Sequence, residues 1–85
     1  MRINYTSKFR KSLQKQISST IDVLEKKLEL FQQNPFTPLL KTHKLKGKLK
    51  KYWAFSVTKK IRVLFIFESD DEATLVNIGS HEIYY

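Results

Sequence analysis

The hydrophobic positions near the start of the chain repeat at two different periods. Residues 2–5, Arg-Ile-Asn-Tyr, alternate in character, and this alternation predicts a short strand. Thr6 and Ser7 follow, and both side chains can cap the N-terminus of a helix. An apolar residue then recurs at every fourth position, at Phe9, Leu13 and Ile17. This stripe predicts a short amphipathic helix over about residues 8 to 16.

A second helix is predicted to follow residues 18–20, Ser-Ser-Thr, which interrupt the first stripe and can cap a new helix. Its apolar residues share one face, namely Ile21, Leu24, Leu28 and Phe31. Asp22 and Glu25 fall near its N-terminus, where the helix dipole favours negative charge. The helix is expected to end at residues 34–38, Asn-Pro-Phe-Thr-Pro, because proline removes an amide donor. The two segments together predict a helical hairpin.

The second half of the chain changes to a period of two, which is typical of strands. Bulky apolar residues alternate with smaller or polar ones from Tyr52 to Val57, and an almost continuous apolar run follows from Ile61 to Phe67. A last strand is predicted over residues 73–78. The turns between these strands fall at residues 58–60 and 70–72.

The predicted order of elements is β-α-α-β-β-β. Gly79 is expected to free the backbone so that it leaves the sheet and presents residues 80–85. Two helices followed by a three-stranded meander predict an α+β fold, with the helical hairpin packed on one face of an antiparallel sheet. A chain of 85 residues can bury one modest core, so a single domain over residues 1–85 is expected.

Composition narrows the classes of function. The chain has no Cys, so neither a disulfide nor a thiolate metal site is possible. Its two histidines, His43 and His81, are far apart in sequence and have no obvious third ligand, so we expect no metal and no cofactor. We also find no signal peptide and no apolar run long enough to cross a membrane, which predicts a cytoplasmic protein without a membrane partner.

Charge adds a candidate partner. Sixteen Lys and Arg against eight Asp and Glu give a formal net charge of +8, which attracts polyanions. Six lysines are concentrated in one segment, at Lys41, Lys44, Lys46, Lys48, Lys50 and Lys51. We interpret them as RNA-binding residues. The alternative is a solvated loop, or an edge strand whose charges prevent aggregation.

Four residues of the second half could carry chemistry. Arg62, in an otherwise apolar strand, should either pair with a carboxylate or bind an anion on the open face of the sheet. His81 is either an ordinary loop residue or a proton donor or acceptor. Tyr84 and Tyr85 either fray or stack on unpaired bases of RNA.

Four segments then occur in a distinctive order. They are residues 43–47 (HKLKG), a Tyr-Trp strand, residues 61–65 (IRVLF) and residues 78–85 (IGSHEIYY). This succession resembles the RelE/ParE toxin superfamily, which has a K-L-x-G segment, a Y-R-[LVI]-[LVI]-[YF] strand and a closing I-G-[TS]-H-[DE]-x-[VY]-Y segment. The resemblance covers the whole chain, and its closing segment is the most specific part.

The resemblance implies a type II toxin of the RelE/YafQ kind: an endoribonuclease that cuts messenger RNA on the ribosome and is silenced by a cognate antitoxin, which the charge of this chain predicts to be acidic. Attack by a ribose 2′-hydroxyl on the adjacent phosphate needs a proton acceptor, a proton donor and nearby cations. By resemblance, Arg62 matches a catalytic arginine and His81 matches an arginine or a histidine. His43 matches a histidine of YafQ-like members, Lys46 a basic loop residue, and Tyr85 the closing aromatic.

Two positions depart from the YafQ-like pattern. Ser56 and Lys60 stand where those members have a second histidine and an aspartate, so cleavage should be slow or should use a different base. This departure favours one alternative, the same fold acting as a non-catalytic RNA- or protein-binding module. Inhibition of DNA gyrase, as in the ParE branch, is a third interpretation, but His81 and the closing aromatic match the ribonuclease branch better.

Overall fold

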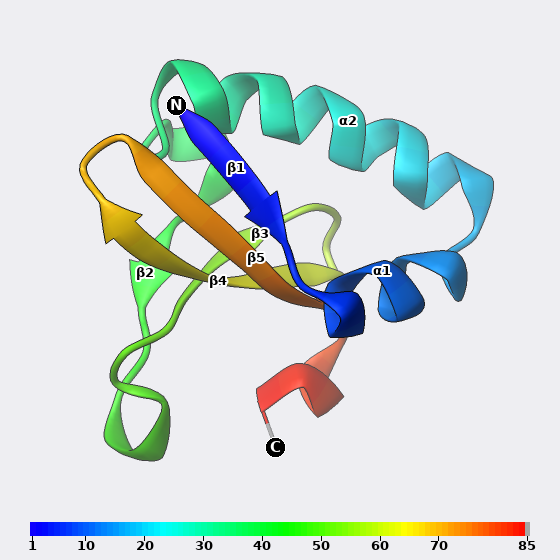
Figure 1. Cartoon of the computed structure of the whole chain (residues 1–85). Helices are drawn as coiled ribbons and strands as arrows, with labels where there is room; N and C mark the ends of the chain where they lie inside the picture. Colours follow the sequence, from blue (N-terminus) through cyan, green and yellow to red (C-terminus); the bar gives the residue numbers. More distant parts are fainter. Residues whose placement is uncertain (85) are drawn as a thin grey trace.

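The computed structural model describes residues 1–84, and Tyr85 lies outside the described residues. Five strands and two helices make up the framework (Figure 1). In chain order these are β1 (Arg2–Tyr5), α1 (Ser7–Gln14), α2 (Ser18–Gln33), β2 (His43–Lys44), β3 (Trp53–Ser56), β4 (Arg62–Ser69) and β5 (Glu72–Gly79). Three short 3-10 turns complete the described chain, at η1 (Pro38–Leu40), η2 (Gly47–Leu49) and η3 (His81–Tyr84).

The sheet has the order β1-β5-β4-β3-β2. The α+β class and the meander of β3, β4 and β5 are confirmed, but the sheet is mixed and not wholly antiparallel. β1 pairs with β5 in parallel, whereas the other neighbours are antiparallel. The meander leaves one edge of β5 unpaired, and β1 occupies this edge in the same direction as β5. β2 is absent from the predicted order of elements, because two residues are too few to show an alternation, but it lies at the edge of the sheet within the lysine segment, for which an edge strand was one alternative.

The helix boundaries differ from the predicted ones near Ile17. The Thr6 side chain caps α1 as expected, since its Oγ1 accepts the Phe9 amide at 3.0 Å. Ile17 does not extend the apolar stripe of α1: it is 69% exposed and is the extended residue before α2. Residues 18–20 are therefore the first turn of α2 and not its cap. Asp22 and Glu25 consequently lie beyond that turn, which holds no acidic residue.

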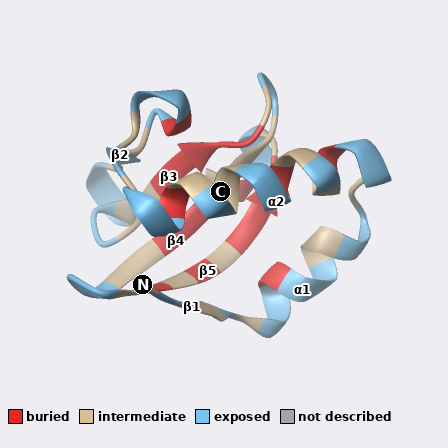
Figure 2. Cartoon of the chain, turned by 90° about the horizontal axis from the view of Figure 1, so that it is seen from above, coloured by how far each residue is buried: buried red, intermediate tan, exposed pale blue. Residues whose placement is uncertain are grey.

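The core lies between the helices and one face of the sheet. Buried residues concentrate on β3, β4 and β5 and on the facing side of α2 (Figure 2). Phe31 of α2 packs at the centre, with ring centroids 5.1 Å from Phe55 and 5.0 Å from Phe65. α1 contributes Phe9 to the same core. α1 and α2 do not pack closely along their whole length. An open groove lined by residues of both helices lies between them.

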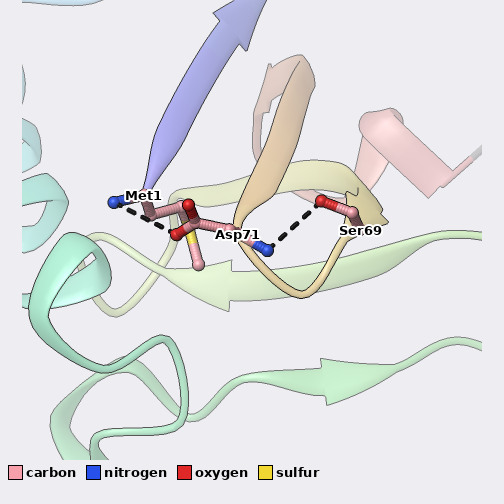
Figure 3. Close-up of polar contacts among 3 residues, drawn as sticks. All are labelled: Met1, Ser69 and Asp71. Carbon is pink, nitrogen blue, oxygen red and sulfur yellow. Dashed lines mark hydrogen bonds and ion pairs between the residues drawn. The ribbon is translucent and has the colours of Figure 1, made fainter.

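The turn between β4 and β5 also holds the start of the chain (Figure 3). The Asp71 amide donates to Ser69 Oγ at 3.2 Å, and the Asp71 carboxylate lies 3.6 Å from the amino group of Met1. The Arg2 amide donates to the Asp71 carbonyl at 2.8 Å. These contacts fix the register at which β1 joins the sheet. Within residues 1–84 no helix is both long enough and apolar enough to span a bilayer.

Candidate functional site

The register of the sheet brings the end of β3, the start of β4 and the end of β5 together. Arg62, the first residue of β4, pairs with Ser56 at the end of β3 and with Gly79 at the end of β5. β2 lies on the other side of β3, where His43 pairs with Ala54. Residues that follow β5 therefore lie beside the turn that precedes β4, although they are about twenty positions apart in sequence.

An open cleft of about 610 Å³ lies at this end of the sheet. Its lining consists of His43, Lys59, Lys60, Arg62, Ser80, His81 and Tyr84. Three cationic side chains, two imidazoles, a phenol and a hydroxyl thus share one space, and among residues 1–84 no carboxylate lines it. Such a cleft can hold a phosphate group and present proton donors and acceptors to it.

Arg62 is held by backbone oxygens. Its Nη1 donates to the Thr58 carbonyl at 2.7 Å and approaches the Ile61 carbonyl at 3.4 Å. Of the two interpretations of this residue, the carboxylate pair is not formed, since within residues 1–84 the ion pair of Met1 with Asp71 is the only one. The side chain is half-buried and faces the cleft. Its guanidinium is therefore oriented by the β3–β4 turn and can accept an anion.

His81 is carried on a tight turn after β5. Ser80 N–H and Oγ–H both donate to the carboxylate of Glu82, and these hydrogen bonds, with the side-chain bond from Ser80 as the largest cause, lower the pKa of Glu82. Ile83 is only 4% exposed and anchors the turn, while His81 remains exposed. Gly79 is needed for close packing and not for backbone freedom as predicted, because its φ is not positive and an added Cβ would lie 2.6 Å from Glu82 Oε1.

His43 reaches the cleft from the edge strand β2. Its Nδ1 lies 3.0 Å from the Lys41 carbonyl oxygen. A carbonyl can only accept, so the hydrogen of this bond belongs to Nδ1. In the neutral ring Nε2 is then an acceptor, which is the form that a general base requires.

The lysine segment lies mostly outside the cleft. Lys44, Lys46, Lys48, Lys50 and Lys51 are exposed on β2 and on the loop that leads to β3. Figure 1 shows this loop and η3 extending to the side of the sheet away from α2. The Lys51 ammonium lies 5.3 Å from the centre of the Tyr52 ring. Lys41 lines a neighbouring cavity.

The two departures from the family pattern differ in position. Lys60 lines the cleft, so it adds a cation there. Ser56 is buried and lines the neighbouring cavity. Tyr84 lines the cleft, with its ring centroid 6.4 Å from that of His81. The prediction for Tyr85 lies outside the described residues.

Sequence reasoning missed two residues of the cleft, Lys59 and Ser80. The sequence pattern indicates only a turn at Lys59 and only a motif position at Ser80. The predicted strands could have indicated both residues. If residues 61–67 and 73–78 are antiparallel neighbours, the turn before residue 61 lies beside the residues that follow residue 78. Within the described chain no group of three or more His, Cys, Asp or Glu residues is placed to hold a metal ion.

Comparison with known proteins identifies the family. Residues 1–84 match the family described as "Bacterial toxin of type II toxin-antitoxin system, YafQ". No curated protein matched the chain.

Solved toxin structures share the fold. YafQ from E. coli has a TM-score of 0.78 at 18% identity, covering 100% of this chain and 99% of its own; it also matches in its complex with DinJ. A YoeB/ParE toxin from Agrobacterium tumefaciens gives 0.79 at 18% identity, over 95% of this chain and 99% of its own. A copper-bound mutant toxin from Helicobacter pylori gives 0.71 at 26% identity, over 100% of this chain and 99% of its own. The match over residues 1–84 shows that the chain belongs to the YafQ family of bacterial type II toxins, within the RelE superfamily.

Proposed function

We propose that this toxin is an endoribonuclease that cuts messenger RNA on the ribosome, and that the cut is made in the cleft. One observation carries the proposal: two imidazoles and the Arg62 guanidinium line a single open space. Cleavage by a ribose 2′-hydroxyl requires a base, an acid for the leaving oxygen and positive charge around the phosphate. The side chains of the cleft can supply each of these.

The geometry supports a division of roles. Arg62 would stabilise the charge that develops on the phosphate, because its guanidinium is already oriented by the Thr58 carbonyl. His43 would act as the base, because its Nδ1 bond leaves Nε2 as the acceptor. His81 would act as the acid for the leaving oxygen. Tyr84 would stack on a base, and the same role is proposed for Tyr85.

The lysine segment would supply affinity for the ribosome and for RNA in the cytoplasm. Each lysine that neutralises a phosphate releases counterions, so this binding should weaken steeply with salt. The exposure of Lys44, Lys46 and Lys48 outside the cleft fits a role in binding and not in proton transfer.

A protein partner is also proposed. E. coli YafQ forms a complex with DinJ. We propose that an acidic antitoxin also binds this chain and neutralises it by folding over its basic surface. High salt should then slow association more than dissociation.

Lys60 favours one second candidate function. It places a positive charge in the cleft at a position where YafQ-like members carry an aspartate, by the resemblance described above. A chain that had lost its chemistry in this way would still bind RNA or a protein partner.

Mapping RNA ends after the purified protein is added to translating ribosomes distinguishes the two functions. A nuclease gives cuts in phase with codons, whereas a binding module gives none. If His81 transfers a proton, His81→Ala should lower the single-turnover rate by roughly 10²-fold to 10⁴-fold with ribosome affinity and fold unchanged. Arg62→Ala should lower the rate and also the stability, which must be measured beside it. Equal cutting by His81→Ala and the parent chain at saturating ribosome would remove His81 from the mechanism.

A further inference from the structure

A second basic cavity adjoins the cleft. It has a volume of about 330 Å³ and shares two residues with the cleft, Lys59 and Arg62. The rest of its lining is Lys27, Leu39, Lys41, Ser56, Val57 and Thr58. Four cationic side chains thus surround this cavity, and no carboxylate of the described chain lines it. Because Lys59 and Arg62 line both spaces, they stand between the cleft and the second cavity.

Lys27 is the residue that distinguishes this cavity from a merely basic surface. It comes from α2, whereas the residues of the cleft come from β2, from the β3–β4 turn with the start of β4, and from the segment after β5. Lys27 is half-buried, unlike its exposed neighbour Lys26, and its Nζ donates to the Leu39 carbonyl at 3.3 Å. An ammonium has three donors, so this bond leaves two for a ligand. Within the described chain no carboxylate pairs with it.

The turn after α2 forms another part of the wall of this cavity. Lys41 has a left-handed backbone, with φ of 52°, and follows the 3-10 turn η1. This conformation is uncommon for a residue other than glycine, and it reverses the chain so that Lys41 and Leu39 line the same cavity. Leu39 is 64% exposed and offers an apolar surface on which a ribose can pack.

We infer that this second cavity binds the backbone phosphate of the nucleotide next to the scissile one in single-stranded RNA, through Lys27 and Lys41. The inference rests on the proposed function, because it takes the cleft to hold the scissile phosphate. The RNA backbone would then cross Lys59 and Arg62, with one phosphate on each side of them. A phosphodiester fits the site chemically. Its charged oxygens accept hydrogen bonds from several donors, and it has no hydrogen-bond donor that would need a carboxylate as its partner.

The test measures binding without cleavage. The probe is a short single-stranded RNA with 2′-O-methyl groups, which lacks the attacking hydroxyl, and its affinity is measured by fluorescence anisotropy over a range of salt concentrations. Lys27→Ala is compared with Lys26→Ala, which removes the same charge from the neighbouring, exposed position. Loss of one phosphate contact should weaken binding about fivefold at 0.1 M salt and reduce the salt slope by about 0.7. Lys26→Ala should change neither quantity appreciably, and Lys27→Arg should restore most of the affinity.

Equal effects of Lys27→Ala and Lys26→Ala would overturn the inference, because they would indicate a general electrostatic contribution. Failure of the proposed function gives a different result. Binding that depends on Lys27 in a protein that never cuts RNA would support the phosphate site and contradict the nuclease. Codon-phased cutting with no difference between the two lysines would support the nuclease and contradict the phosphate site.

Discussion

Gly79→Ala tests the packing that carries His81 into the cleft. A Cβ at this position would lie 2.6 Å from Glu82 Oε1 and 2.8 Å from Ile83 Cγ2. The Glu82 side chain can move away, but it then loses the hydrogen bonds from Ser80. Ile83 is buried and has little room to move. The substitution therefore either displaces the η3 turn or strains it.

The size of the effect follows from two opposing terms. Overpacking at a buried site costs about 1–3 kcal/mol. The φ of Gly79 is not positive, so alanine is compatible with the backbone and restricts the unfolded chain, which returns about 0.4–1 kcal/mol. We expect a net loss of roughly 1–2 kcal/mol in the free energy of unfolding. A shift of about 1 Å at His81 would also slow cleavage by up to about 10²-fold.

Urea unfolding and single-turnover cleavage should be measured on the same preparations. Gly47→Ala is the matched control, because Gly47 has φ of 66° and an added Cβ there would meet nothing within 4 Å. Alanine at Gly47 should cost about 1–2 kcal/mol through backbone strain alone and leave the rate of cutting once bound unchanged. If Gly79→Ala unfolds at the urea concentration of the parent chain and cuts at the same rate, the packing described for η3 is wrong.

Three further predictions concern the Glu82 carboxylate, the cap of α1 and two exposed lysines. The pKa of Glu82 is lower in the folded protein than in the unfolded chain, so ionised Glu82 stabilises the fold. This stabilisation is complete above the ordinary carboxyl pKa of about 4.3 and is lost as the pH falls through the pKa of Glu82 in the folded protein. Glu82→Gln should make the unfolding midpoint depend less on pH in that acidic range. An unchanged dependence on pH would count against the hydrogen bonds from Ser80. Thr6→Ala should cost about 1 kcal/mol or somewhat more in urea unfolding, because Thr6 Oγ1 caps α1 and also donates to the Val76 carbonyl at 2.9 Å. An unshifted midpoint would contradict the cap. Lys48→Ala combined with Lys50→Ala should weaken ribosome binding and its salt dependence while leaving the rate of cutting once bound near that of the parent. A large loss of rate at saturating ribosome would place these lysines in the chemistry.

Local patterns in the sequence predicted most of the elements and the antiparallel meander of β3, β4 and β5, but not the pairing of β1 and β2. Alternation predicts β3, and the apolar run predicts β4, where the consecutive residues Val63, Leu64 and Phe65 are all buried. The parallel pairing of Asn4 with Thr74 has no comparable signal, since its partners are 70 positions apart. Ile17 was misassigned because a period of four also fits an exposed apolar residue between two helices.

The candidate site was predictable in part for a similar reason. The order of the segments pointed to His43, Arg62 and His81, and the cleft brings all three together. Lys59 and Lys27 carry no motif of their own. Their positions depend on how the β3–β4 turn and α2 lie against the sheet, which is a property of tertiary packing and not of local pattern.

The parallel pairing of β1 with β5 has a consequence for synthesis of the chain. A nascent chain emerges with its N-terminus first, and domains fold as their residues become available. β1 must then remain without its partner until Glu72 and the residues after it have been made, because Arg2 pairs with Glu72 and Tyr5 pairs with Leu75. The same last strand leads directly into Ser80 and His81. The cleft therefore cannot form before β5, Ser80 and His81 have been synthesised, and a nascent chain that stops short of these residues lacks it.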